Sequence, residues 1–150
     1  MSIFIRSPKT EKEYLEYFHF RWRMLRQPYG GEPGTEKDNL EDKSFHIMLT
    51  EFGKIIGVGR IHFEEKGDSK KGQIRYMAIN QLYQKRGYGT KILKALEAYA
   101  TKDKANNIFL NSRSAAVEFY KKNGYKTIKK THLLFGKIQH WLMVKQIVKK

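Results

Sequence analysis

The chain has 150 residues, 40% of them hydrophobic, which is enough for one core and excludes a wholly disordered protein. It has no cysteine, so disulfides, thiolate metal sites and a cysteine nucleophile are excluded, and we expect no metal site. The net charge is +15, and residues 76–150 hold 16 basic but only 3 acidic side chains, so we expect an anionic ligand to bind in this half.

This length predicts a single domain over residues 1–150. No apolar run is long enough for a signal peptide or for the roughly 20 residues of a membrane helix. We therefore expect a cytoplasmic protein that does not bind membranes.

Hydrophobic periodicity and turn residues predict the elements of the first half. Thr10 followed by Glu13 is typical of a capping box, so a helix should begin there. The expected elements are a strand at Ile3–Arg6, a helix from Thr10 that ends before Pro28, a loop over residues 28–44 with one helical turn near Asp38–Asp42, strands at His46–Thr50 and Lys54–Phe63, a charged turn at Glu64–Lys71, and a strand at Gln73–Ile79.

The second half predicts a helix, a buried strand, a second helix and two final strands. The expected elements are a turn at Gln84–Gly89, a helix with the apolar stripe Ile92, Leu93, Leu96, Tyr99 and Ala100, a strand at Ile108–Leu110, a helix over about Ala115–Asn123 capped by Ser112 or Ser114, and antiparallel strands at Tyr125–Ile128 and Gln139–Ile147 joined by a basic connection. The whole order, β-α-β-β-β-α-β-α-β-β, predicts a mixed α/β domain with one sheet and helices on its faces.

The glycine turn Gln84–Gly89 precedes a helix, and a helix N-terminus offers free backbone N–H groups to an anion. Lys85 and Arg86 add positive charge, which favours a phosphate or pyrophosphate ligand. The glycine spacing is too short for a Walker A loop, and Ile92 stands where a dinucleotide fingerprint has its third glycine.

A second motif follows about 30 residues later. Q-x-x-G-x-G over Gln84–Gly89, together with A-x-x-F-Y-x-x-x-G-Y over Ala116–Tyr125, resembles the GNAT superfamily of N-acetyltransferases. The order of elements is similar to the GNAT acyl-CoA N-acyltransferase fold along essentially the whole chain. The resemblance implies an acetyltransferase that moves the acetyl group of acetyl-CoA to a primary amine by direct attack in a ternary complex.

The resemblance also implies site residues. Tyr120 matches the position whose hydroxyl protonates the departing thiolate of coenzyme A. The strand before the glycine turn would hold the pantetheine arm, the turn itself would hold the pyrophosphate, and Asn111 would bond the pantetheine amides. The implied cofactor-binding residues are Met77, Ala78, Ile79, Gln84, Lys85, Arg86, Gly87, Tyr88, Gly89, Thr90 and Asn111.

The acceptor and the general base stay open at this point. An amine must lose a proton before it attacks, and the candidate bases are Glu41, Asp42, His46, His62, Glu64 or a water molecule. Glu97 and Glu118 are expected to face solvent. We expect a small-molecule or peptide amine as the acceptor and no nucleic acid partner, and a homodimer is one expectation. Two alternatives are a basic nucleic-acid-binding module and a GNAT-like domain that binds acetyl-CoA without catalysis.

Overall fold

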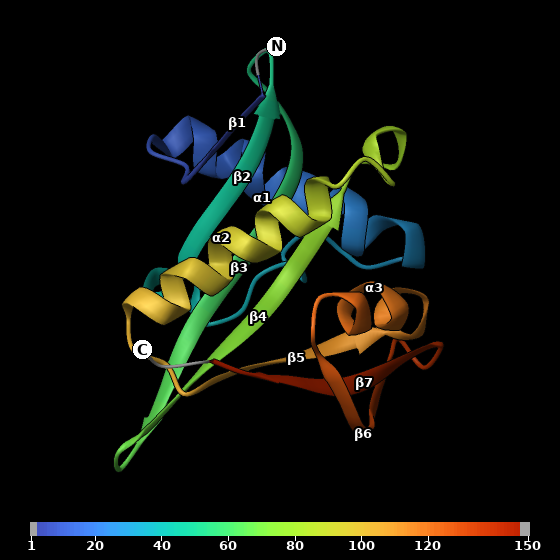
Figure 1. Cartoon of the computed structure of the whole chain (residues 1–150). Helices are drawn as coiled ribbons and strands as arrows, with labels where there is room; N and C mark the ends of the chain where they lie inside the picture. Colours follow the sequence, from blue (N-terminus) through green and yellow to red (C-terminus); the bar gives the residue numbers. More distant parts are fainter. Residues whose placement is uncertain (1–2, 148–150) are drawn as a thin grey trace. The chain divides into compact units, whose positions relative to one another are not determined.

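The computed structural model describes residues 3–147, and its elements follow the predicted order (Figure 1). They are β1 Ile3–Arg6, α1 Glu11–Leu25, β2 Phe45–Glu51, β3 Lys54–Lys66, β4 Ser69–Ile79, α2 Tyr88–Lys102, β5 Asn107–Arg113, α3 Val117–Lys122, β6 Lys126–Leu134 and β7 Ile138–Gln146. The strands form one sheet in the order β1-β2-β3-β4-β5-β7-β6. β5 runs parallel to β4, whereas β1–β2, β2–β3, β5–β7 and β6–β7 are antiparallel.

Several predicted boundaries were wrong. The segment expected as a charged turn, Glu64–Lys71, is mostly strand, because β3 continues to Lys66 and β4 already begins at Ser69. Likewise the expected basic connection is largely strand, since β6 continues to Leu134. Charged side chains suit exposed strand residues as well as turns, and most of β6 is exposed. Pattern alone therefore placed these turns too early and made them too long.

The chain divides into two compact units. One contains the residues up to His62 together with Tyr76–Leu96, and the other contains Phe63–Arg75 together with the residues from Glu97. Among residues 3–147, no helix is both long and apolar enough to cross a membrane.

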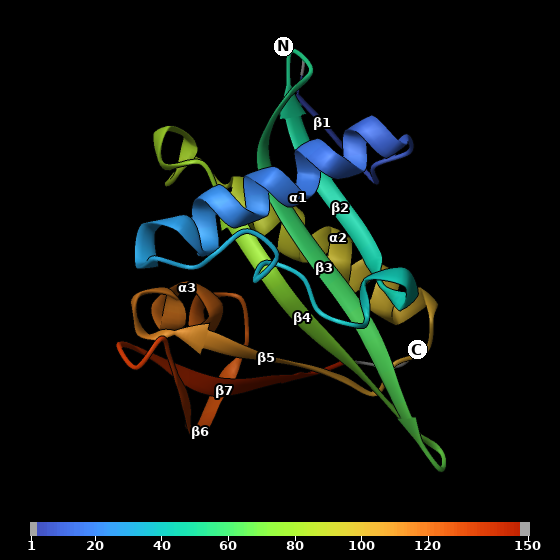
Figure 2. The same cartoon turned by 180° about the vertical axis from the view of Figure 1, so that it is seen from behind.

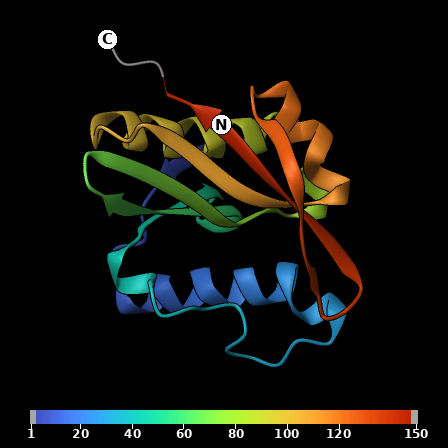
Figure 3. The same cartoon turned by 90° about the horizontal axis from the view of Figure 1, so that it is seen from below.

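In the first unit, α1 and the first part of α2 cover opposite faces of β2 and β3 (Figures 1–3). Alternation along β3 explains this arrangement. Val58 is fully buried in a core cluster with Tyr17 and Phe20 of α1. On the other face, a Cβ on Gly59 would lie 2.7 Å from Ile92 of α2, and one on Gly57 would meet the same side chain. The absence of a side chain at these two glycines therefore lets α2 pack closely on this face of β3.

Helix α1 begins as predicted. Thr10 caps it by accepting a hydrogen bond from the Glu13 backbone N–H at 3.1 Å. The helix ends at Leu25, followed by a 3-10 turn at Gln27–Tyr29. From there the connection runs back beside α1 to the start of β2 (Figure 2), and it forms a second 3-10 turn at Glu41–Lys43.

In the second unit, β5, β7 and β6 form an antiparallel ladder with α3 packed against β5 and β6. Ser112 and Ser114 do not cap this helix: Ser114 begins a 3-10 turn, and α3 starts at Val117 without a side-chain cap. Glu97 does not face solvent freely, because its carboxylate accepts from the Tyr125 hydroxyl at 2.8 Å and from Lys145 Nζ at 3.2 Å.

Candidate active site

The glycine turn lies in the first unit: it follows a 3-10 turn at Gln81–Tyr83, and its last two residues are the first two residues of α2. Lys85 and Gly87 both have left-handed backbone, with φ of 65° and 83°. The bond from the Lys91 N–H to the Gly87 carbonyl, at 3.1 Å, opens the α2 hydrogen-bond series, so the preceding amides have no partner within the helix. This backbone exposes N–H groups at the positive end of a helix, as an anion site requires.

Local contacts fix the position of this turn. The Gln84 side-chain amide donates to the Ile79 carbonyl at 3.1 Å, which joins the turn to the end of β4. The Tyr83 hydroxyl donates to Glu51 Oε1 at 3.0 Å, and Arg86 lies over the Tyr83 ring at 5.3 Å from its centroid. The carboxylate bond raises the pKa of Tyr83 above its ordinary value. Lys85, Arg86 and Gly87 are exposed, so the turn presents two cations and an unobstructed backbone, which fits a pyrophosphate.

The last residues of β4, Met77–Ile79, are partly buried. The residue before them has an unusual backbone: Tyr76 has φ of 60°, in the left-handed region that a bulky side chain rarely adopts. The N–H that follows them, on Asn80, donates to the Ile56 carbonyl of β3 at 2.8 Å. The predicted pantetheine segment therefore lies between a distorted residue and a fixed one.

Tyr120 and Asn111 lie in the second unit. Tyr120 is in α3, with its side chain buried and its ring 5.0 Å from Phe119 and 5.7 Å from Tyr125. Burial raises its pKa well above the ordinary value, opposed by the positive charge of Arg113. A phenol with a raised pKa keeps its proton, which is the form that can donate to a developing thiolate. Asn111 lies within β5, opposite Leu142 of β7.

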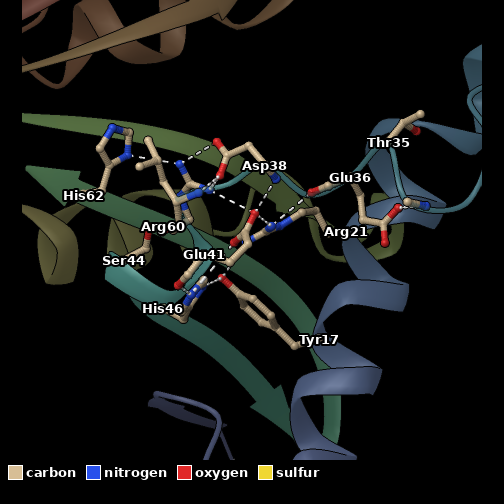
Figure 4. Close-up of polar contacts among 12 residues, drawn as sticks. Tyr17, Arg21, Thr35, Glu36, Asp38, Glu41, Ser44, His46, Arg60 and His62 are labelled. Carbon is tan, nitrogen blue, oxygen red and sulfur yellow. Dashed lines mark hydrogen bonds and ion pairs between the residues drawn. The ribbon is translucent and has the colours of Figure 1, made fainter.

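A buried polar cluster in the first unit was not predicted (Figure 4). One fully buried member is Arg60 of β3, which lies on the same face as Val58. Its guanidinium donates to both Asp38 carboxylate oxygens, at 2.7 and 3.0 Å, to Glu41 Oε2 at 3.0 Å, and to His62 Nδ1 at 3.0 Å. Burial opposes the charge of Arg60, but these carboxylates raise its pKa above the ordinary value. Because a guanidinium only donates, His62 Nδ1 carries no proton.

Arg21 of α1 is the second fully buried cation. It donates to Glu41 Oε2 at 2.9 Å, to the Glu36 carbonyl at 3.0 Å and to the Tyr17 hydroxyl at 3.0 Å (Figure 4). Glu41 Oε2 also accepts from the Asp38 backbone N–H at 3.0 Å. One carboxylate oxygen thus joins α1, β3 and the loop between α1 and β2.

His46 of β2 completes the cluster. Its Nε2 lies 2.8 Å from the Glu41 carbonyl, and its Nδ1 lies 2.9 Å from the Tyr17 hydroxyl. Burial lowers the pKa of His46, and the nearby Arg21 and Arg60 lower it further, against the opposing effect of Glu41. The neutral ring therefore donates from Nε2, which leaves Nδ1 as an acceptor, and the single Tyr17 hydroxyl proton lies between this nitrogen and the Gly59 carbonyl 3.0 Å away. Burial also raises the pKa of Tyr17 to about 12, so its hydroxyl stays protonated.

One wall of this cluster faces a surface pocket of about 570 Å³. Three carboxylates and two aromatic rings contribute to its lining, and the Lys37 ammonium lies 4.4 Å from the centroid of the Phe18 ring. The lining residues are Tyr14, Phe18, Lys37, Asp38, Asn39, Glu41, Asp42, Ser44 and His46.

The candidate bases differ in position. Glu41, His46 and His62 are brought together in the cluster, Asp42 is exposed on the pocket wall, and Glu64 is exposed in the second unit. Sequence reasoning missed Tyr17, Arg21 and Arg60, although two signals were available: Tyr17 and Arg21 are four residues apart on a helix, and Arg60 occupies an inward position of an apolar strand.

Comparison with known proteins gives a consistent result. The Acetyltransferase (GNAT) family matches residues 8–125. A curated relative, the uncharacterized N-acetyltransferase YjcF of Bacillus subtilis (strain 168), is 29% identical over 137 residues, which cover 91% of this chain and 95% of that protein.

Solved structures show the same fold. An aminoglycoside 6′-N-acetyltransferase complexed with coenzyme A has a TM-score of 0.79 at 13% identity, covering 100% of this chain and 99% of the other. An acyl-CoA N-acyltransferase from Pseudomonas aeruginosa has a TM-score of 0.79 at 15% identity, covering 96% and 98%. The predicted fold is confirmed, and the chain belongs to the GNAT family of acetyltransferases, which use acetyl-CoA.

Proposed function

We propose that this acetyltransferase moves the acetyl group of acetyl-CoA to a primary amine by direct attack in a ternary complex, with Tyr120 as general acid. The observation that carries the assignment of the acid is the buried Tyr120 phenol, whose pKa is raised by burial. As the bond between the acceptor nitrogen and the acetyl carbon forms, the carbon–sulfur bond breaks and the Tyr120 hydroxyl gives its proton to the sulfur.

The residues proposed to hold acetyl-CoA have matching chemistry. Backbone amides and cations from Gln84 to Thr90 suit the pyrophosphate, since N–H groups there lie at the start of α2. Main-chain groups of Met77, Ala78 and Ile79, together with Asn111, would bond the pantetheine amides. The hydrogen bond from Gln84 to Ile79 supports a continuous binding segment, because it holds the turn against the end of β4.

The pocket beside α1 supports an acceptor that carries an ammonium group. Carboxylates line it in a protein whose net charge is +15, and Lys37 already lies against the Phe18 ring in the manner of a bound cation. The guanidinium groups of Arg21 and Arg60 both donate hydrogen bonds to the Glu41 carboxylate, and Arg60 also donates to His62 Nδ1. We therefore assign removal of the acceptor proton to the exposed Asp42 or to water.

An acetyl-transfer screen tests this function. Purified protein with acetyl-CoA would be offered polyamines, amino acids, aminoglycosides and lysine peptides, with release of coenzyme A thiol as the readout. We expect turnover with amines that carry a second positive charge. Absence of turnover over the whole library, despite acetyl-CoA binding by calorimetry, would support the non-catalytic alternative. Binding to DNA at moderate salt without binding to coenzyme A would support the nucleic-acid alternative. The cytoplasmic location and the homodimer stay predictions.

A further inference from the structure

Tyr76 has a backbone conformation that its own side chain disfavours. Its φ of 60° lies in the left-handed region, although it is a bulky aromatic residue inside a strand. Such a conformation persists only where the surrounding structure holds it. Its side chain is buried in the first unit, where contacts of its ring help to hold this backbone.

Three guanidinium groups surround that ring. The Cζ atoms of Arg21, Arg60 and Arg26 lie 4.1, 5.0 and 5.5 Å from the ring centroid of Tyr76. Arg21 and Arg60 are fully buried and Arg26 is nearly so, and cation–π attraction is strongest where the cation is desolvated. We call these three arginines the arginine brace.

The loop between α1 and β2 fixes each arginine of the brace from its other side. Arg26 Nε donates to the Thr35 carbonyl at 3.0 Å, next to the Glu36 carbonyl that accepts from Arg21. Arg60 is held by Asp38, as described above. The same loop supplies part of the pocket proposed for the acceptor. Because it accepts hydrogen bonds from all three arginines, its conformation helps to fix the positions of their guanidinium groups.

The position of Tyr76 in the chain connects the arginine brace with the proposed acetyl-CoA site. It immediately precedes Met77–Ile79, and one left-handed residue in a strand changes the direction of the N–H and C=O groups that follow. We propose that Tyr76 is a positioning residue for the acetyl-CoA site. The arginine brace holds its ring, and the left-handed backbone of Tyr76 sets the main chain of Met77–Ile79 for the pantetheine arm. The loop between α1 and β2 stabilises this arrangement through the arginines. This inference rests on the proposed function.

The main test compares Tyr76→Phe, which keeps the ring, with Tyr76→Leu, which removes it and leaves the strained backbone unsupported. Coenzyme A binding is measured by calorimetry. We expect Tyr76→Phe to bind as the wild type does and Tyr76→Leu to bind about tenfold more weakly, a factor within the range of one strained residue. With a good acceptor, the KM for acetyl-CoA should rise in Tyr76→Leu while kcat at saturation stays near the wild-type value.

A readout without ligand separates this inference from the proposed function. Hydrogen exchange of the free protein should be faster over Met77–Ile79 in Tyr76→Leu than in Tyr76→Phe. If the wild type does not bind coenzyme A, the proposed function fails, whereas faster exchange would still support the brace. Equal exchange and equal coenzyme A affinity in the two variants would overturn it.

Two further variants keep the test decisive. If Tyr76→Leu does not fold, Tyr76→Met replaces it, because methionine is flexible enough to fill irregular buried space but lacks the ring and does not favour the left-handed region. Weakened coenzyme A binding in folded Tyr76→Met supports the brace, and wild-type binding contradicts it. Tyr99→Leu is the matched control: it removes a partly buried tyrosine ring that packs on Phe63, and neither residue is among those proposed to hold coenzyme A, so the affinity should not change.

Discussion

Arg60 and Asp38 are 22 residues apart in the chain, yet the guanidinium of Arg60 donates to both carboxylate oxygens of Asp38, at 2.7 and 3.0 Å. Arg60 is fully buried, while the Asp38 side chain is 18% exposed. Arg60, a buried strand residue, thus anchors the loop between α1 and β2 at the protein surface. Removing the carboxylate would leave much of the Arg60 charge uncompensated, and Glu41 would be its remaining carboxylate partner.

We therefore expect Asp38→Asn to lower the free energy of unfolding by about 3 kcal/mol, as is typical when one partner of a buried pair is removed. Urea denaturation at neutral pH measures this loss. Glu118→Gln is the control, since the exposed pair of Glu118 and Lys121, 3.7 Å apart, should contribute almost nothing. Equal stability of the two variants would show that Asp38 does not anchor the loop.

A second prediction concerns Gly87, whose φ is 83° and whose Cβ position is open. Gly87→Val should weaken coenzyme A binding by about tenfold. The strain of valine in left-handed backbone costs a free energy that corresponds to about this factor in Kd. Gly67→Val is a closely matched control. Gly67 also has a left-handed φ, 60°, and open space at its Cβ position, but it lies in the turn between β3 and β4.

Calorimetry with coenzyme A compares the two glycine variants, and thermal unfolding reports the strain that they share. We expect similar losses of stability and a loss of affinity in Gly87→Val alone. A loss of affinity of the same size in Gly67→Val would mean that strain affects binding indirectly, and the role of the glycine turn would be refuted.

The third prediction concerns pH. Burial lowers the pKa of His46 below that of the unfolded chain, where it is near 6.5. A histidine buried in its neutral form must take up a proton when the protein unfolds in acid. Its contribution to stability is therefore present above pH 6.5 and is lost as the pH falls below that value. Arg21 and Arg60 strengthen this trend, whereas Glu41 opposes it.

Urea unfolding at several pH values between 5 and 8 tests the role of His46. His46→Gln should be less stable than the wild type at pH 8, because it alters the contacts with Tyr17 and Glu41. Its stability should also decline less steeply toward pH 5. Parallel pH profiles for the variant and the wild type would assign the acid sensitivity to other groups.

Local patterns predicted the order of elements and the start of α1. The capping box of Thr10 and Glu13 is a signal within four residues, and the structure confirms it. Such features depend on neighbours in sequence, so the sequence alone specifies them.

The buried cluster depends on distant pairs instead. Arg60 meets Asp38 across 22 positions, and Arg21 meets Glu41 across 20. No periodicity in the sequence indicates such a pair, because a single arginine or acidic residue, taken alone, is typical of the protein surface. The left-handed backbone of Tyr76 likewise depends on residues that are distant in the sequence. The residue types of β4 do not favour it, and the three arginines around its ring lie in α1, directly after α1 and in β3.

The last prediction separates chemistry from binding at Tyr120. Tyr120→Phe removes the proton donor and keeps nearly all of the ring packing against Phe119 and Tyr125. General acid catalysis contributes about 10²- to 10⁴-fold, so kcat should fall by a factor in that range while acetyl-CoA affinity changes little. Because burial raises the Tyr120 pKa, the phenol should stay protonated beyond pH 10, and activity should not decline between pH 8 and 10 through loss of this acid. Tyr125→Phe is the matched control, since it removes a hydroxyl bound to Glu97 from the adjacent ring and should lower stability more than kcat. A Tyr120→Phe enzyme with near-normal kcat, under conditions where chemistry limits the rate, would make Tyr120 a packing residue, and water would then have to protonate the thiolate.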